Sequence, residues 1–138
     1  MTPPRLHVAL VAASAGGTLG ALARWRLTDL FPVGTGFPTT VFWINVVGCA
    51  LLATLPAFAA VRRRPWLGVF LGTGVLGGFT TMSAASEQTV VLLEHDRVGT
   101  AAAYAGGTLA VALAAVWLVD FWTSPADREL LERDEADE

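Results

Sequence analysis

The chain is organised around one segment, residues 72–86, which reads Gly72-Thr-Gly-Val-Leu-Gly-Gly-Phe-Thr-Thr-Met-Ser-Ala-Ala-Ser86. The segment lies in an apolar run typical of a membrane span, yet it is rich in Gly, Thr and Ser. A broken backbone in hydrocarbon leaves N–H and C=O groups without water, which is tolerated only where protein or a polar cavity satisfies them. A span that unwinds at mid-membrane therefore indicates a site for a small ion or solute.

The composition favours an integral membrane protein. Of the 138 residues, 54% are hydrophobic and only 15% are charged. Four stretches contain no Asp, Glu, Lys or Arg, and each is near or above the length that a bilayer requires; they are residues 6–23, 37–61, 65–86 and 98–119. We therefore expect an all-α fold of four transmembrane helices.

The predicted helices cover residues 6–23, 39–61, 66–93 and 98–121. The third is longer than a bilayer core needs at ~1.5 Å per residue, and a break would absorb the excess. The obvious place for the break is the group of four glycines, Gly72, Gly74, Gly77 and Gly78. In the first helix, Gly16-x-x-x-Gly20 would let another helix approach closely. Although Arg5 and the small residues at 13–15 resemble a signal peptide, the apolar run continues to residue 23, which favours a retained helix.

Charge is distributed unevenly along the chain. Residues 124–138 contain seven acids and two arginines, so their net charge is −5, whereas the whole chain has a net charge of −3. We therefore expect a domain over 1–123 and a disordered acidic tail over 124–138. An even number of spans puts both termini on one side with six arginines, against three on the other (Arg24, Arg26 and Arg97). The positive-inside rule then predicts cytoplasmic termini in the plasma (inner) membrane.

Several polar residues lie inside the predicted spans, and each has two readings. Asn45 either forms a hydrogen bond between packed helices or donates into a polar path. The hydroxyls of Thr80, Thr81, Ser83 and Ser86 can bond back to helix carbonyls, but their position beside four glycines favours a site. Carbonyls freed by a break at 77–80 would suit a cation such as Na⁺, whereas the hydroxyl and amide donors would suit an anion.

Other candidates lie near the ends or faces of the spans. Arg24 is either a snorkelling anchor or a charge that attracts anions at a vestibule. Tyr104 and Thr108 are four residues apart and share a helix face, with core packing as the alternative. Glu87 is the one acid well inside a predicted span, and the single cysteine, Cys49, is read as a small packing residue. No metalloprotease, nucleotide-binding or cysteine–histidine motif is present, so we do not expect an enzyme.

Taken together, these residues resemble the small fluoride channels called Fluc or CrcB. The resemblance covers about residues 16–118, and four pieces carry it in order. They are Gly17-Thr-Leu-Gly-Ala-Leu-Ala-Arg24, then Asn45-Val-Val-Gly48, then Gly77-Gly-Phe-Thr-Thr81 with Ser83, and finally Tyr104 with Thr108. Each piece alone is weak, whereas their order across four spans is specific.

The resemblance implies an antiparallel, dual-topology dimer of four-helix subunits that conducts fluoride passively. It implies a structural Na⁺ at the dimer centre, held by the backbone carbonyls of Gly77 and Thr80. The implied fluoride pathway includes Asn45 as the pore asparagine and Arg24 as the vestibule arginine, together with Thr81, Ser83, Tyr104 and Thr108. Thr108 replaces a serine that is usual in the family.

The chain departs from the family where two phenylalanines normally face the fluoride path. Met82 and Ala85 occupy those two positions, and Ala84 replaces a threonine. Either the chain forms a heterodimer with a second homologous subunit that supplies the aromatic rings, or it forms a homodimer with an altered pore. We favour the heterodimer, because the arginine bias of this chain would need a partner of opposite orientation.

Two other functions are alternatives. A proton-coupled small multidrug-type transporter would need a titratable carboxylate in the membrane, and only Glu87 could serve. A non-conducting partner subunit of a membrane assembly would use its glycine-rich faces for packing alone.

Overall fold

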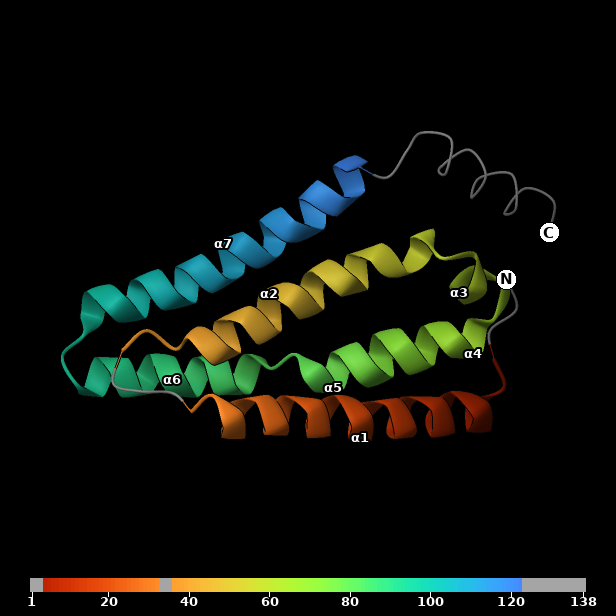
Figure 1. Cartoon of the computed structure of the whole chain (residues 1–138), viewed down its shortest axis with the longest axis horizontal. Helices are drawn as coiled ribbons and strands as arrows, with labels where there is room; N and C mark the ends of the chain where they lie inside the picture. Colours follow the sequence, from red (N-terminus) through yellow and green to blue (C-terminus); the bar gives the residue numbers. More distant parts are fainter. Residues whose placement is uncertain (1–3, 33–35, 123–138) are drawn as a thin grey trace.

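The computed structural model describes residues 4–32 and 36–122, and every regular element among them is a helix (Figure 1). In chain order, the elements are α1 (Leu6–Leu30), α2 (Thr39–Thr54), the 3-10 turn η1 (Leu55–Ala57), α3 (Ala59–Arg63), α4 (Pro65–Gly68), the π-helical η2 (Val69–Leu76), α5 (Gly77–Phe79), α6 (Met82–Glu94) and α7 (Val98–Trp122). The predicted acidic tail lies outside the described residues.

Four helical stretches are long and apolar enough to cross a membrane, which confirms the predicted all-α, four-span fold. They are Leu6–Leu30, Thr39–Ala57, Pro65–Glu94 and Val98–Val119. Successive spans run in opposite directions in Figure 1, so the start of α1, the short α3 and the end of α7 lie at one end of the molecule. The α1–α2 connection and the α6–α7 turn lie at the other.

The third span is broken, as predicted, but the break is not at the glycines. From Pro65 to Phe79 the chain stays helical, with wide turns over Val69–Leu76. Thr80 and Thr81 are then extended, with φ/ψ of −75°/154° and −152°/116°, before α6 begins at Met82. The expectation that the glycines themselves unwind was wrong, because they serve to bring two helices together.

These glycines let α1 pack directly on the first half of the third span. A Cβ atom added to Gly16 would lie 2.9 Å from the Gly74 Cα, and one added to Gly78 would lie 3.0 Å from the Gly17 Cα. A Cβ added to Gly20 would collide with the carbonyl of Val75. Small residues therefore allow backbone-to-backbone contact, as the Gly16-x-x-x-Gly20 pattern predicted.

Two predicted helix boundaries were wrong. The first helix continues to Leu30 instead of ending before Arg24. The second ends at Thr54 instead of continuing through residue 61, because Pro56 has no N–H to donate into the helix. One 3-10 turn follows, Phe58 is extended with ψ 116°, and Arg62 donates to the Pro56 and Ala57 carbonyls at 2.9 Å each.

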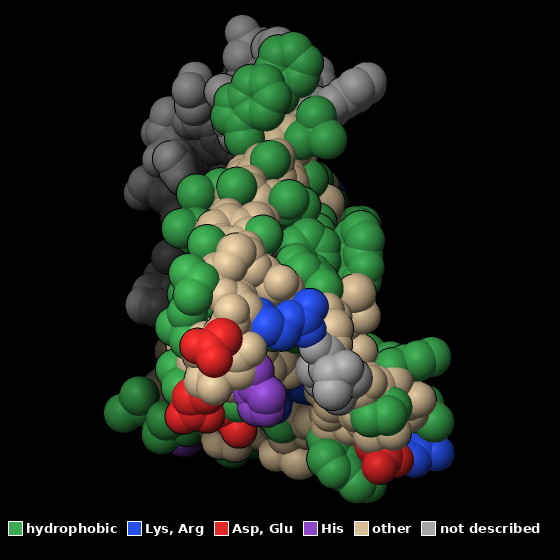
Figure 2. All heavy atoms as spheres, turned by 90° about the vertical axis from the view of Figure 1, so that its left-hand side faces the viewer, with side chains coloured by type: hydrophobic (Ala, Val, Ile, Leu, Met, Phe, Trp, Pro, Cys, Tyr) green, Lys and Arg blue, Asp and Glu red, His purple; other side chains and the backbone are tan. Residues whose placement is uncertain are grey.

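Polar and charged side chains gather at the end of the bundle where α6 joins α7. Viewed from that end in Figure 2, acidic, basic and histidine side chains lie among exposed hydrophobic ones. The α6–α7 turn has a residue in the left-handed region, Asp96, with φ 57°. The Arg97 N–H donates to the Leu92 carbonyl at 2.9 Å, and the Asp96 N–H donates to Leu93 at 3.0 Å. This hydrogen-bond pair is a Schellman helix stop.

Candidate functional site

The break in the third span is bridged by the side chain of Asn45, which comes from the middle of α2. Its Oδ1 accepts the Thr81 N–H at 2.8 Å, and its Nδ2 donates to the Thr81 carbonyl at 3.0 Å. Asn45 is buried, with 8% of its surface exposed. One amide thus satisfies both backbone groups of a residue that no longer belongs to a helix, as the apolar surroundings require.

The break also redirects the donors that a continuous helix would use. With i→i−4 pairing, the Thr81 N–H would donate to the Gly77 carbonyl, but it donates to Asn45 instead. The Ala84 N–H would donate to the Thr80 carbonyl, but it donates to Thr81 Oγ1 at 3.2 Å, which caps α6. Gly77 and Thr80, the two residues predicted to hold Na⁺, are therefore among the residues whose carbonyls lose their helical donors at the break.

Arg24, from the predicted set, and Gly48, from the family motif, also lie against the break. Arg24 Nε donates to the Gly78 carbonyl at 3.2 Å. Arg24 lies inside α1 and does not follow the end of its helix, and the Gly78 carbonyl that it bonds lies near the middle of the third span. Gly48, one turn after Asn45, leaves the space that the Thr80 methyl group occupies, because a Cβ there would collide with Thr80 Cγ2.

A groove of about 350 Å³ runs along α6 and α7 from the break. Most of its wall is apolar, and its polar side chains form one strip: Asn45, Thr80, Thr81, Ser86, Thr89 and Thr108. Three of these hydroxyls donate to the backbone carbonyl one helical turn earlier: Thr80 to Leu76, Thr89 to Ala85 and Thr108 to Tyr104. Thr81 Oγ1 instead accepts a hydrogen bond, so its own hydrogen remains a donor.

The structure brings three of the six predicted pathway residues to this groove, namely Asn45, Thr81 and Thr108. Met82 and Ala85 line it, with Met82 76% exposed and Ala85 buried. Ser83 is exposed on α6 and does not line the groove. Tyr104 has no exposed surface and packs in the core formed by α2, α6 and α7.

Sequence reasoning missed Gln88, Thr89 and Cys49 as site residues. The Tyr104 hydroxyl donates to Gln88 Oε1 at 2.7 Å, which ties α7 to α6 beside the groove. Cys49 and Thr89 line the groove itself. The signal was available, because Thr89 lies at i+4 from Ala85 and Cys49 at i+4 from Asn45, which places each pair on one helix face.

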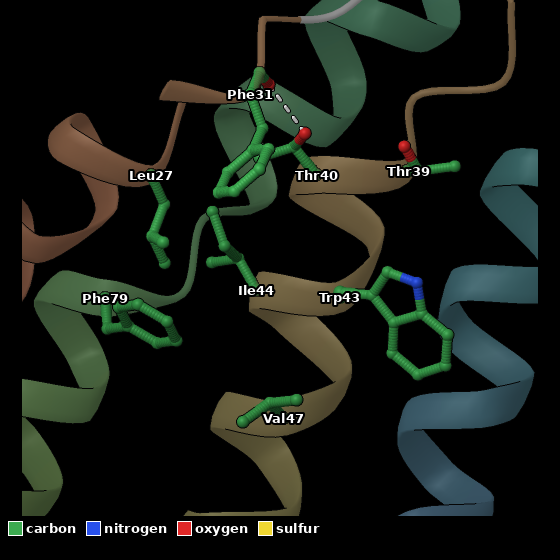
Figure 3. Close-up of a pocket in the computed structure, with 8 residues that line it drawn as sticks. All are labelled: Leu27, Phe31, Thr39, Thr40, Trp43, Ile44, Val47 and Phe79. Carbon is green, nitrogen blue, oxygen red and sulfur yellow. Dashed lines mark hydrogen bonds between the residues drawn. The ribbon is translucent and has the colours of Figure 1, made fainter. Parts of the chain in front are cut away.

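Two other cavities border this region. A larger groove of about 840 Å³ runs between the end of the second span and η2, and its lining includes Gly77 and Thr80. A pocket of about 360 Å³ lies between α1, α2 and α5 (Figure 3). In the pocket, Leu27, Phe31, Ile44 and Phe79 present apolar side chains, and the Thr40 hydroxyl donates to the Phe31 carbonyl at 2.7 Å. The break thus lies between a polar strip and a groove whose lining includes Gly77 and Thr80.

A polar break inside a bundle of four apolar spans defines this chain as a multi-pass helical membrane protein with a candidate ion site. Residues 11–119 match the family described as CrcB-like protein, Camphor Resistance (CrcB), and the chain belongs to that family.

Curated relatives support the same assignment. The chain is 39% identical over 117 residues to the "Fluoride-specific ion channel FluC" of Methylobacillus flagellatus, covering 81% of this chain and 90% of the relative. It is 41% identical over 120 residues to "FluC 1" of Streptomyces coelicolor, covering 80% and 73%. It is also 41% identical over 120 residues to "FluC 2" of Nocardia farcinica, covering 84% and 85%.

Proposed function

We propose that this chain is a subunit of a fluoride-selective channel that lets fluoride leave the cytoplasm passively. The observation that carries the proposal is the broken third span, bridged by Asn45 and bordered by a polar strip, in a protein whose relatives are named fluoride-specific ion channels. The chain is not expected to be an enzyme, because the proposed function is to conduct fluoride along a polar path and not to catalyse a reaction.

The physical demand of fluoride fits the donors at this groove. The ion is small and strongly hydrated, so removing its water without substitute donors is prohibitively costly. The Thr81 hydroxyl accepts a hydrogen bond and can still donate its own hydrogen. The Asn45 amide has a second N–H besides the one that it donates to the Thr81 carbonyl. Pore width and donor placement then set selectivity. A membrane potential that is negative inside drives the anion outward.

A structural Na⁺ is part of the proposal. The carbonyl oxygens of Gly77 and Thr80 are hard, neutral ligands at the carboxyl end of a half-helix, which is the negative end of its dipole. Their helical donors are redirected to Asn45 and Thr81. These oxygens fit a monovalent cation, which when bound would supply a fixed positive charge near the anion path.

The proposed assembly is a dimer of antiparallel subunits in the plasma membrane, with the termini of this chain in the cytoplasm. We favour a heterodimer over a homodimer, since Met82 and Ala85 stand at positions that the family fills with phenylalanine. Relatives named FluC 1 and FluC 2 are consistent with organisms that have more than one such chain.

The test is fluoride efflux from liposomes, measured with a fluoride electrode after a potassium ionophore starts the flux. Liposomes that contain the chain with its homologous companion should release fluoride, and Asn45→Leu should reduce the rate at least tenfold. Glu87→Gln is the matched control, because Glu87 is exposed on α6 and does not line the groove. Loss of transport in Glu87→Gln with retention in Asn45→Leu would favour proton-coupled export instead.

The heterodimer is tested separately with the same assay. The purified chain alone should conduct poorly, and coexpression with a second homologous four-span subunit that carries both phenylalanines should restore efflux. Robust efflux from liposomes that contain this chain alone would establish the homodimer.

A further inference from the structure

We infer that Asn45 is a positioning residue for the cation site, in addition to lining the anion path. By accepting the Thr81 N–H, Asn45 keeps the Gly77 carbonyl oxygen open to a cation. The inference rests on the proposed Na⁺ site and assigns its construction to two side chains of this chain.

The hydrogen-bond distances carry the argument. Two acceptors compete for the Thr81 N–H. In a continued helix it would donate to the Gly77 carbonyl, and otherwise it can donate to Asn45 Oδ1 on α2. The structure shows the second at 2.8 Å, and the same amide closes the pair by donating to the Thr81 carbonyl at 3.0 Å. This two-point contact holds Thr81 in an extended conformation that no helix could share.

The Thr81 side chain frees a second carbonyl in the same way, about one turn later. Its Oγ1 accepts the Ala84 N–H at 3.2 Å, so the Thr80 carbonyl loses the donor that a continuous helix would supply. Each carbonyl of the proposed cation site is thus opened by one side chain. Gly77 is opened by Asn45, and Thr80 is opened by Thr81.

Neighbouring residues make room for Thr80 and occupy the Gly78 carbonyl. The absence of a side chain at Gly48, on the same face of α2 as Asn45, lets the Thr80 methyl group lie against the helix. The intervening Gly78 carbonyl accepts a hydrogen bond from Arg24 Nε at 3.2 Å, so it is already occupied. Gly77 and Thr80 both line the groove on the side away from α7.

The experiment measures Na⁺ binding directly on the full-length chain in detergent, with its companion subunit if one copurifies. The probe is NaCl titrated against choline chloride at constant ionic strength, with the thermal unfolding midpoint and ²³Na NMR line width as readouts. Asn45→Leu should weaken Na⁺ binding ~10–100-fold, the range for residues that orient metal ligands. Thr81→Val should weaken it in the same direction, because valine cannot accept the Ala84 N–H.

Two variants separate positioning from other effects. Asn45→Asp keeps an acceptor for the Thr81 N–H, so its Na⁺ affinity should stay within about threefold of the parent chain even if fluoride flux falls. Thr108→Val removes a hydroxyl of the same groove that already donates to the Tyr104 carbonyl on its own helix, and should leave Na⁺ affinity unchanged. If Asn45→Leu unfolds, Asn45→Asp and Thr81→Val still decide the question.

Unchanged Na⁺ affinity in folded Asn45→Leu or Thr81→Val would overturn the inference while leaving the proposed channel intact. A parent chain with no saturable Na⁺ response would overturn both the inference and the Na⁺ site. Fluoride efflux, measured separately, would then decide whether the proposed conduction fails as well.

Discussion

Single side chains at the break determine which backbone groups there are hydrogen-bonded. Asn45 was open to two readings, a hydrogen bond between helices or a donor on a polar path. Its two hydrogen bonds to Thr81 fit the first reading, and its second N–H is the donor that the second reading requires. The hydroxyls also differ in whether they can donate to an ion. Thr108 already donates to the Tyr104 carbonyl, whereas the Thr81 hydroxyl only accepts a hydrogen bond and keeps its hydrogen available.

Cys49 offers a residue-scale test of the groove. It is the one cysteine of the chain, is partly exposed and lines the groove beside Asn45. We predict that a membrane-permeant maleimide lowers fluoride efflux from liposomes severalfold, because the adduct would fill much of a narrow path. Cys49→Ala should conduct and resist the reagent. An unmodified rate after complete labelling would show that fluoride does not pass along this groove.

The elements are arranged around the contact between α1 and the first half of the third span. Glycines permit that contact, and the half-helix that they hold in place ends at the break. The second span then approaches the break through Asn45 and Gly48. The break is therefore supported from two sides, by glycine packing on α1 and by hydrogen bonds from α2.

Gly78→Ala tests the packing of α1 on the first half of the third span. The added Cβ would lie 3.0 Å from the Gly17 Cα and closer still to the Gly17 carbonyl oxygen. We predict a loss of about 1–3 kcal/mol in unfolding free energy, the usual cost of overpacking, measured by reversible unfolding in detergent. Gly99→Ala is the control, since its Cβ meets nothing within 4 Å. Equal stability of the two variants would contradict the backbone contact.

The α6–α7 turn provides a second test at the scale of elements. Asp96 has φ 57°, a conformation that glycine adopts without steric cost. Asp96→Gly should raise the unfolding free energy by roughly 0.5–1 kcal/mol, whereas Asp96→Ala should lower it, because alanine is strained in the left-handed region. The same detergent unfolding assay measures both. A gain in stability for alanine would argue against the helix stop described above.

At the scale of the whole molecule, the arginines are arranged asymmetrically. Among the described residues, Arg5, Arg62, Arg63 and Arg64 belong to one end, and Arg26 and Arg97 to the other. Arg24 bonds to the Gly78 carbonyl near the middle of the third span, so we leave it out of this count. The described arginines then divide four to two, in the same direction as the sequence alone indicated.

Orientation should respond to this bias. Replacing the exposed Arg63 and Arg64 with Gln should change a mostly single orientation into a mixture, because loop arginines determine topology. Arg62 is left in place, since it bonds to the Pro56 and Ala57 carbonyls. A reporter fused to the C-terminus would measure the two populations. Arg26→Gln should instead strengthen the original orientation, and an unchanged ratio in both variants would contradict the expectation.

Composition and pattern were enough to establish the membrane class, the four spans and the existence of a polar break, because these follow from local hydropathy and from helix length. The resemblance in sequence also pointed to Gly77, Thr80 and Asn45 together. Only tertiary structure decided the position of the break at Thr80–Thr81, the bond from Arg24 to the Gly78 carbonyl and the Tyr104–Gln88 bond. Each depends on which residue of another helix lies opposite, and a pattern along one chain does not contain that information.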